Sequence, residues 1–169
     1  MTIDTINLDH YGQPPLPWER ARAALEGFAA APDKPSYLST GDPDGRPHTT
    51  GIGAFWGDGG IYFTSGLSTR KSRNLAANPF CTIAIPLSGI DLVLEGTAAV
   101  VTDPERLEHI AATARAGGWP AEVTGDALTA PFSAPSAGPP PWHLYFVTLE
   151  SAVGVATEPP DGATRWRFH

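Results

Sequence analysis

The sequence predicts a mainly β protein, a small barrel of about six strands beside two or three helices. Turn signals recur every roughly 8–12 residues between short apolar segments, which is typical of antiparallel barrels. Eighteen glycines and eighteen prolines in 169 residues indicate many turns rather than long helices. Because 41% of the residues are apolar and the length suits one domain, we expect residues 1–169 to share a single core.

The expected strands are rich in apolar and β-branched residues and are bounded by turn residues. They cover residues 36–40, 48–56, 61–65, 80–86, 90–102, 142–157 and 165–168. Residues 42–45 read Asp-Pro-Asp-Gly, which places proline and glycine where a tight turn needs them. A second turn, Gly-Asp-Gly-Gly at 57–60, follows the next strand. The first three strands therefore predict a meander.

The remaining segments divide into helices and irregular chain. Helices are expected at 18–31, 68–77 and 103–116, an N-terminal arm at 1–17 and a proline-rich loop at 117–141. Trp18, Leu25 and Phe28 have helical spacing and fall on one face of the first helix. Asp103 followed by Pro104 predicts the N-cap and first turn of the third helix.

Composition excludes several classes of function. A formal charge of -7 argues against nucleic acid as the main partner. The single cysteine, Cys81, rules out an intrachain disulfide and a cysteine-based zinc site, and it suits a reducing compartment. We expect Cys81 to be buried in its apolar strand, and the histidines lack the spacing of a metal site. With no apolar run near 18 residues and no signal pattern, we expect a cytoplasmic protein without a membrane span.

The helix at 68–77 begins with an unusual charge. Arg70 and Lys71 fall in its first turn, although the N-terminal end of a helix is already electropositive. Three of the eleven cations lie within four residues here, and no acid occurs between Asp58 and Asp91. One interpretation is a bound anion such as a phosphate, held by backbone N–H groups, hydroxyls and cationic side chains. The alternative is a solvated face paired to acids distant in sequence.

The second strand contains two glycines, Gly51 and Gly53. Glycine weakens a strand and often marks the close approach of another group, so a flat ring against this backbone would explain both. A β-bulge or barrel corner would also explain them. Together with the anion site, the glycines predict a phosphate-bearing aromatic cofactor, bound without the Gly-x-Gly-x-x-Gly fingerprint, which is absent.

Five motifs extend this interpretation. They are Tyr37-Leu38-Ser39-Thr40, Asp44-Gly45-Arg46-Pro47-His48, Ile61-Tyr62-Phe63-Thr64-Ser65, Arg70-Lys71-Ser72-Arg73-Asn74-Leu75 with Asn78-Pro79, and Leu94-Glu95-Gly96-Thr97-Ala98. Their order and spacing resemble those of the pyridoxamine 5'-phosphate oxidase-like split barrels, which are flavin and deazaflavin oxidoreductases. The resemblance covers residues 36–102 well and extends weakly to residues 165–168.

The resemblance implies a six-stranded Greek-key split barrel that forms homodimers, with FMN or the deazaflavin coenzyme F-420 in a groove between the subunits. The cofactor-binding residues that it implies are His48, Thr49, Thr50, Gly51, Ile52, Thr64, Ser65, Arg70, Lys71 and Asp91. Arg70 and Lys71 would hold the cofactor phosphate, assisted by Thr64 and Ser65. The segment 48–52 would run along the ring system, and Asp91 falls near a position that can touch the ring.

Departures from the family pattern restrict the function. Thr50 and Phe55 stand where true pyridoxamine phosphate oxidases carry an arginine and a lysine, so the vitamin B6 reaction is not expected. The run from Lys71 to Leu75 is closer to the deazaflavin branch. We expect an oxidoreductase that transfers a hydride to or from a small organic substrate. The cofactor carries that chemistry, so no catalytic side chain is singled out.

Two alternatives remain from sequence: a non-catalytic protein that binds or stores a flavin, deazaflavin or haem, and a barrel that has lost its ligand. The segment 117–141 bears on this choice. Its large apolar residues, Trp119 and Phe132, together with Trp142, either line a substrate pocket or pack over the end of the barrel.

Overall fold

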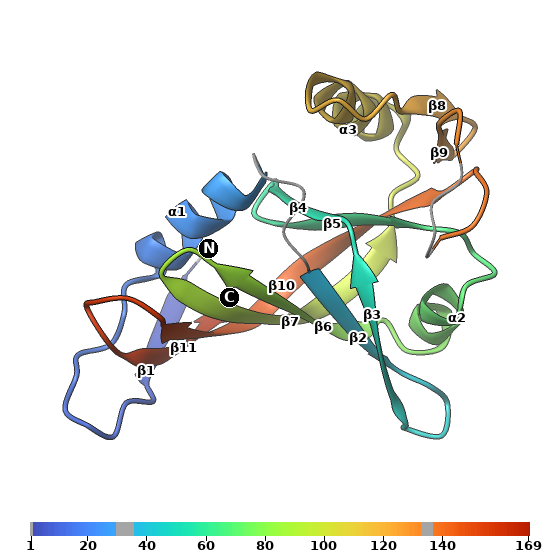
Figure 1. The fold of residues 1–169 in the computed structure, drawn as a ribbon. Helices are drawn as coiled ribbons and strands as arrows, with labels where there is room; N and C mark the ends of the chain where they lie inside the picture. Colours follow the sequence, from blue (N-terminus) through green and yellow to red (C-terminus); the bar gives the residue numbers. More distant parts are fainter. Residues whose placement is uncertain (1, 30–35, 133–136) are drawn as a thin grey trace.

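The computed structural model describes residues 2–29, 36–132 and 137–169 (Figure 1). The strands are β1 (Ile3–Asn7), β2 (Ser36–Gly41), β3 (Pro47–Ile52), β4 (Ala54–Gly57), β5 (Gly60–Ser65), β6 (Phe80–Leu87), β7 (Ile90–Val100), β8 (Glu122–Thr124), β9 (Ala127–Thr129), β10 (His143–Ala156) and β11 (Ala163–Phe168). The helices are α1 (Trp18–Ala29), α2 (Arg70–Ala77) and α3 (Pro104–Ala116). The prediction of a mainly β protein with three helices is confirmed. None of the helices in these ranges is long and apolar enough to cross a membrane.

A branched antiparallel sheet forms the body of the molecule. Its strand order is β1-β11-β10-β7-β6-β2-β3, and β5 pairs with both β10 and β4. One edge of β10 pairs with β7 along most of its length, with a register shift between Leu149 and Ser151. The other edge pairs with β5 over residues 143–147 and with β11 over residues 151–155. The sheet therefore divides into two branches at the middle of β10.

Two apolar clusters fill the fold. The larger cluster includes Trp18, Leu25 and Phe28 of α1, which pack against the sheet. These three side chains are almost fully buried, as their spacing predicts. The smaller cluster lies between α3 and β5, around Tyr62 and Leu107. In Figure 1, α3 and the β8–β9 hairpin lie together at one end of the molecule, and α2 lies beside β2 and β3.

A polar contact fixes α3 over β5. The Tyr62 hydroxyl donates to the Asp58 carboxylate at 2.5 Å and accepts from Arg106 Nε at 2.5 Å. The Arg106 guanidinium also lies 4.2 Å from the centre of the Phe146 ring. Burial and the hydrogen bond to Asp58 raise the pKa of Tyr62 to about 12, so the hydroxyl stays protonated at neutral pH. These contacts of Arg106 thus hold α3 against β5 and β10.

Three sequence expectations need correction. The arm at 1–17 contains β1, which pairs with β11 in full register from Ile3↔Phe168 to Asn7↔Thr164. The strand expected at 48–56 divides at Gly53 into β3 and β4, which pair with different strands. The loop expected at 117–141 contains the β8–β9 hairpin, and Leu128 also bridges to Trp142. With β1 and the division at Gly53, the main sheet has nine strands in the described ranges, rather than about six, and the β8–β9 hairpin forms a separate two-stranded sheet.

The predicted helix ends are close to the observed ones. Thr69 is the N-cap of α2, and Asp103 is the N-cap of α3. Residues 30 and 31, expected at the end of the first helix, lie outside the described residues.

Candidate functional site

The start of α2 is held by three hydroxyl groups. Thr69 Oγ1 caps the helix by accepting from the Ser72 backbone N–H at 3.3 Å. Thr69 donates to Ser72 Oγ at 3.1 Å, Ser72 donates to Ser65 Oγ at 2.9 Å, and Ser65 and Thr69 lie 2.8 Å apart. Because each hydroxyl can donate to the next, the ring closes and ties the first turn of α2 to the end of β5. Ser65, one of the predicted site residues, is therefore fully buried, and its hydroxyl bonds to Thr69 and Ser72.

The three cations of α2 have different surroundings. Arg70 extends outward, about half exposed (49%), and its guanidinium lies 3.4 Å from the Asp42 carboxylate. Arg73 donates to the Ser68 carbonyl. Lys71 is buried, only 3% exposed, and burial lowers the pKa of its ammonium group. The first turn of α2 therefore has a counterion, because the β2–β3 hairpin brings Asp42 beside Arg70. For Arg70, this agrees with the alternative in which the cations pair with acids distant in sequence.

Lys71 lines a cavity of about 290 Å³. Its lining residues come from the β3–β4 corner, β5, α2 and the segment after α3: Ile52, Gly53, Ala54, Phe55, Thr64, Lys71, Trp119, Phe132, Ala137 and Trp142. Three of the predicted site residues, Ile52, Thr64 and Lys71, therefore lie together. They share the cavity with the aromatic residues of the segment expected as a proline-rich loop.

The face of β3 that leads into this cavity is set by strand register. His48, Thr50 and Ile52 alternate along one face, and His48 lies opposite Thr40 of β2. Thr40 accepts a buried hydrogen bond from Asn74 of α2 at 2.9 Å, so this face of β3 is on the α2 side. His48 Nδ1 is buried and has no hydrogen-bond partner in the described part of the chain.

Thr49 and Gly51 belong to the opposite, outward face of β3. The Thr49 hydroxyl lies 2.8 Å from that of Ser39. A Cβ added at Gly51 or at Gly53 would meet no atom of the described residues within 4 Å. Neither glycine has the positive φ that would require it, so the packing of this chain does not explain their presence. Gly53 borders the cavity, and its missing side chain leaves room there for another molecule.

Asp91 lies far from this cavity within one chain. It is the second residue of β7 and pairs with Val155 near the end of β10, whereas Ser65 pairs with His143 at the start of β10. Twelve residues of strand separate the two positions, about 40 Å along β10. The structure thus does not join Asp91 to Lys71 in a single copy of the chain.

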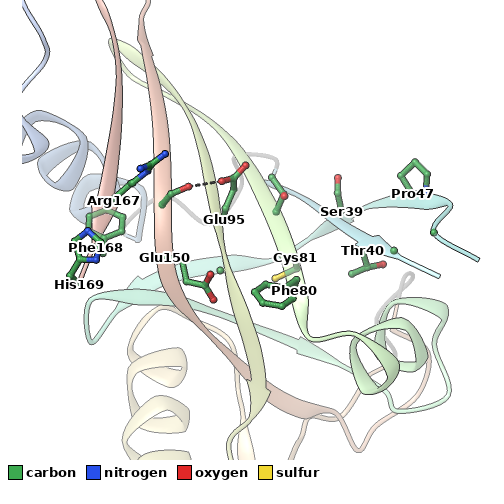
Figure 2. Close-up of a pocket in the computed structure, with 15 residues that line it drawn as sticks. Ser39, Thr40, Pro47, Phe80, Cys81, Glu95, Glu150, Arg167, Phe168 and His169 are labelled. Atoms are coloured by element: carbon green, nitrogen blue, oxygen red, sulfur yellow. Dashed lines mark hydrogen bonds between the residues drawn. The ribbon is translucent and has the colours of Figure 1, made fainter. Parts of the chain in front are cut away.

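A second cavity, of about 730 Å³, lies across β2, β6, β7, β10 and β11 (Figure 2). Figure 2 shows the Glu95 and Glu150 carboxylates between Ser39 on one side and Arg167 on the other. Two carboxylates would repel a phosphate, and the predicted cofactor-binding residues are absent from this lining. Cys81 borders it, is buried as expected, and has its thiol pKa raised by burial to about 12. The Lys71 cavity is therefore the better match to a phosphate-bearing ligand.

Sequence reasoning missed some of the site. The two glycines of the second strand predict close approach of a ring, and Gly53 does line the cavity, whereas Phe55, which also lines it, stands out in the sequence only as a departure from a family pattern. Thr69 and Ser72, which orient the start of α2, carried no signal beyond a helix cap. The sequence identifies Asp42 only as a turn residue, because its contact with Arg70 spans 28 residues of sequence.

Comparisons with known proteins identify related chains. A family model described as "Pyridoxamine 5'-phosphate oxidase" matches residues 22–141. A curated pyridoxine/pyridoxamine 5'-phosphate oxidase from Acidothermus cellulolyticus is 32% identical over 90 residues, which cover 50% of this chain and 40% of the relative. The match thus spans less than half the length of that relative.

Solved structures share the fold at low identity. A pyridoxamine 5'-phosphate oxidase-related, FMN-binding protein from Nostoc punctiforme has a TM-score of 0.59 at 17% identity, covering 91% of each chain. An F420 reductase has a TM-score of 0.52 at 20% identity, covering 75% of this chain and 94% of its own. These similarities show the fold and confirm the expected split-barrel class.

Proposed function

Since the chain belongs to the pyridoxamine 5'-phosphate oxidase family, we propose that it is an oxidoreductase that uses FMN or the deazaflavin coenzyme F-420. Its reaction would be hydride transfer to or from a small organic substrate. The observation that carries this proposal is the cavity that joins the buried Lys71 to open backbone at Gly53. FMN and F-420 both combine a phosphate with a flat ring system, which suits a cation beside an uncrowded strand.

The proposed binding mode assigns the polar end of the cavity to the cofactor. The Lys71 ammonium and the Thr64 hydroxyl would hold the phosphate, aided by N–H groups at the start of α2. The ring system would lie along the α2-facing side of β3, past Ile52 toward His48. A polar ring atom is the kind of partner that the buried His48 Nδ1 lacks. When bound, the cofactor supplies the hydride chemistry, and the chain binds and orients it.

The same geometry disfavours the vitamin B6 reaction. Thr50 lies on the ligand-facing side of β3, and Phe55 lines the cavity while stacking on Tyr62 at 5.2 Å. Neither side chain offers the positive charge that a phosphorylated vitamin would need. A different small molecule is therefore proposed as the substrate.

Catalysis is preferred here over storage because of the segment after α3. The cavity is lined by the side chains of Trp119, Phe132 and Trp142, which leave its volume open. Space beside the cofactor site is what a second reactant needs, whereas a storage protein has no use for it. A cytoplasmic location, where reducing conditions keep Cys81 a thiol, is part of the same proposal.

We further propose a homodimer. Register partners on the outward face of the sheet form a row across six strands: Tyr37, Ala84, Val93, Val153, Arg165 and Ile6. Tyr37 and Val93 are 46% and 37% exposed, and Phe80 and Val155 on the same face are 59% and 49% exposed. A second copy would cover these side chains, since a two-fold interface uses the same patch on both subunits. It could also bring its own Asp91 toward the cofactor groove.

Cofactor binding tests the proposed function. The visible spectrum of the purified protein identifies any bound cofactor, and titration with FMN and with F-420 gives the two Kd values. Lys71→Ala should raise the Kd of the preferred cofactor about 10- to 100-fold, the usual effect of losing a charged hydrogen bond. Arg22→Ala, which removes an exposed cation of α1, should leave it unchanged. Equal affinity in the Lys71 variant would refute the assignment.

A further inference from the structure

We propose that a second copy of this chain docks on the outward face of the sheet through ion pairs, in which the β11 arginines of each copy meet the β7 and β10 carboxylates of the other. This inference rests on the proposed homodimer, and it specifies the contacts that align the two copies. The groups concerned are Arg165 and Arg167 on β11, Glu95 on β7 and Glu150 on β10.

The two arginines of β11 have no acidic partner in their own copy. Arg165 and Arg167 alternate with buried residues and therefore share the outward face of the strand. Within the described ranges, no ion pair joins either guanidinium to an acid, and the buried Arg165 Nε has no hydrogen-bond partner. Asp4 lies opposite Arg167 in register, but its carboxylate lies 3.2 Å from His169 Nε2. These two cations thus stand ready for acids from outside the described chain.

The two carboxylates are held on the same face by neighbouring hydroxyl groups. Glu95 and Glu150 both line the cavity of about 730 Å³ (Figure 2). Ser151 donates to Glu95 at 2.5 Å, and Thr97 donates to Glu150 at 2.5 Å. The register shift after Leu149 inserts Glu150 as an extra residue, and its bond to Thr97 draws its carboxylate toward β7. Each hydroxyl uses one carboxylate oxygen, which leaves the other oxygen for a cation.

Strand register places these charges on opposite sides of one line across the face. The line runs from Val93 on β7 to Ser151 on β10. Both arginines lie on its β11 side, and both carboxylates lie on its β7 side. When two identical faces pack together, the two-fold axis lies between them, and each residue meets the one at the mirror position across that axis. An axis along this line therefore sets the arginines of each copy against the carboxylates of the other.

The pairs that follow identify a second copy as the occupant of this face. Arg167 meets the partner's Glu150, and Arg165 meets the partner's Glu95. The cavity gives the arginine side chains a place to enter, and Phe80, 59% exposed at its edge, offers apolar surface to their methylene groups. A purely acidic or purely basic partner would be repelled by one half of these charges, whereas a copy of the same face matches both halves.

Charge-reversal variants and their mixtures test this arrangement by sedimentation velocity over a dilution series. Arg167→Glu alone and Glu150→Arg alone each create like-charged pairs in the homodimer, so each should raise the dimer Kd about tenfold or more. An equimolar mixture of the two restores opposite charges at every pair and should form a heterodimer with a Kd within about threefold of the native value. Arg165→Glu with Glu95→Arg is an independent set that should behave in the same way.

Mismatched mixtures provide the control for the register. Arg167→Glu mixed with Glu95→Arg keeps as many like-charged pairs as either variant alone, and it should not recover. Arg22→Glu, which reverses an exposed charge of α1, should keep the native Kd. The circular dichroism spectrum of each variant checks that it folds, and the second set decides the test if a variant of the first set does not.

The outcomes separate this inference from the proposals on which it rests. A native dimer whose Kd is unchanged by the reversals would overturn the inference and leave the homodimer standing. So would weaker dimers that the matched mixture does not restore, or equal recovery in matched and mismatched mixtures. A monomeric native protein would refute the homodimer and this inference with it, while titration with FMN and F-420 would still decide the proposed cofactor binding.

Discussion

Lys71 is the residue at which burial and charge oppose each other most directly. The side chain is almost completely buried, and burial lowers the pKa of its ammonium group from 10.5. Without an anion, the folded state binds fewer protons at this group than the unfolded state does, so stability rises with pH between the two pKa values. A bound phosphate would raise the pKa of Lys71 again, because a neighbouring negative charge favours the protonated amine.

This opposition predicts a pH dependence of cofactor binding. The phosphate monoester of FMN is almost fully ionised above about pH 7, and a phosphodiester keeps one negative charge throughout, so a change in affinity at higher pH is not caused by the phosphate. We expect the affinity for the preferred cofactor to fall as the pH rises through the lowered pKa of Lys71, earlier than for an exposed lysine. Titrations from pH 7 to pH 10 measure it. In Lys71→Arg, whose guanidinium stays charged over this range, any remaining affinity should be constant. A parallel fall in both proteins would contradict the role of Lys71.

Residue identity alone draws attention to the two cations at the start of α2, but it does not identify the acid that one of them faces. The mismatch of Lys71 and Arg70 with the helix dipole is visible in the sequence because it depends on residues within one turn. The pairing of Arg70 with Asp42 is not, since it requires the β2–β3 hairpin to fold back onto α2. For Asp91 the sequence suggests a proximity that one chain does not have. The family pattern associates Asp91 with the cofactor, but the register of β7 and β10 separates it from Lys71 within one chain.

At the scale of elements, the corner between β3 and β4 has a glycine that neither the backbone conformation nor the packing of the described residues requires. Gly53 occupies it without a positive φ and without described neighbours where a Cβ would stand. Gly53→Val should therefore keep the free energy of unfolding within about 1 kcal/mol of the native value, because valine suits extended chain. The added side chain should narrow the cavity and raise the Kd of the cofactor at least fivefold, as measured by titration.

Gly27 provides the comparison for this variant. It lies in α1, and a Cβ there also meets no atom of the described residues within 4 Å. Gly27→Ala should stabilise the helix by about 0.5–1 kcal/mol in urea denaturation and leave cofactor binding unchanged. If Gly53→Val binds cofactor as tightly as Gly27→Ala does, the open backbone at the corner is not a ligand site.

The elements that sequence predicted well are those with a local signal. The spacing of Trp18, Leu25 and Phe28 defines a buried helical face, and Asp103 marks a cap. β1 lacked such a signal because its burial pattern is almost entirely exposed and its stability comes from pairing with β11 at the other end of the chain. The β8–β9 hairpin has only three residues in each strand, too few for a periodic pattern.

At the scale of the whole molecule, the two faces of the sheet differ in what covers them. α1 and the larger apolar cluster cover the inner face. The outward row through Tyr37, Val93 and Val153 has no such cover in the described ranges. Side chains alternate between the two faces along any strand, but only the register shows that apolar residues from separate strands align into one row.

The alignment of this row leads to the last prediction. Val93 lies at its centre on β7 and is 37% exposed, so Val93→Glu should fold while placing a carboxylate in the proposed interface. Light scattering should show a dimer for the native protein and a monomer for the variant, because two like charges would meet across a two-fold axis. Cofactor affinity should fall in parallel, since the groove would lose its second subunit. Ala112→Glu adds the same charge to the exposed side of α3 and should remain dimeric. A native monomer that binds cofactor fully would show that one chain builds the whole site, and Asp91 would then have no part in it.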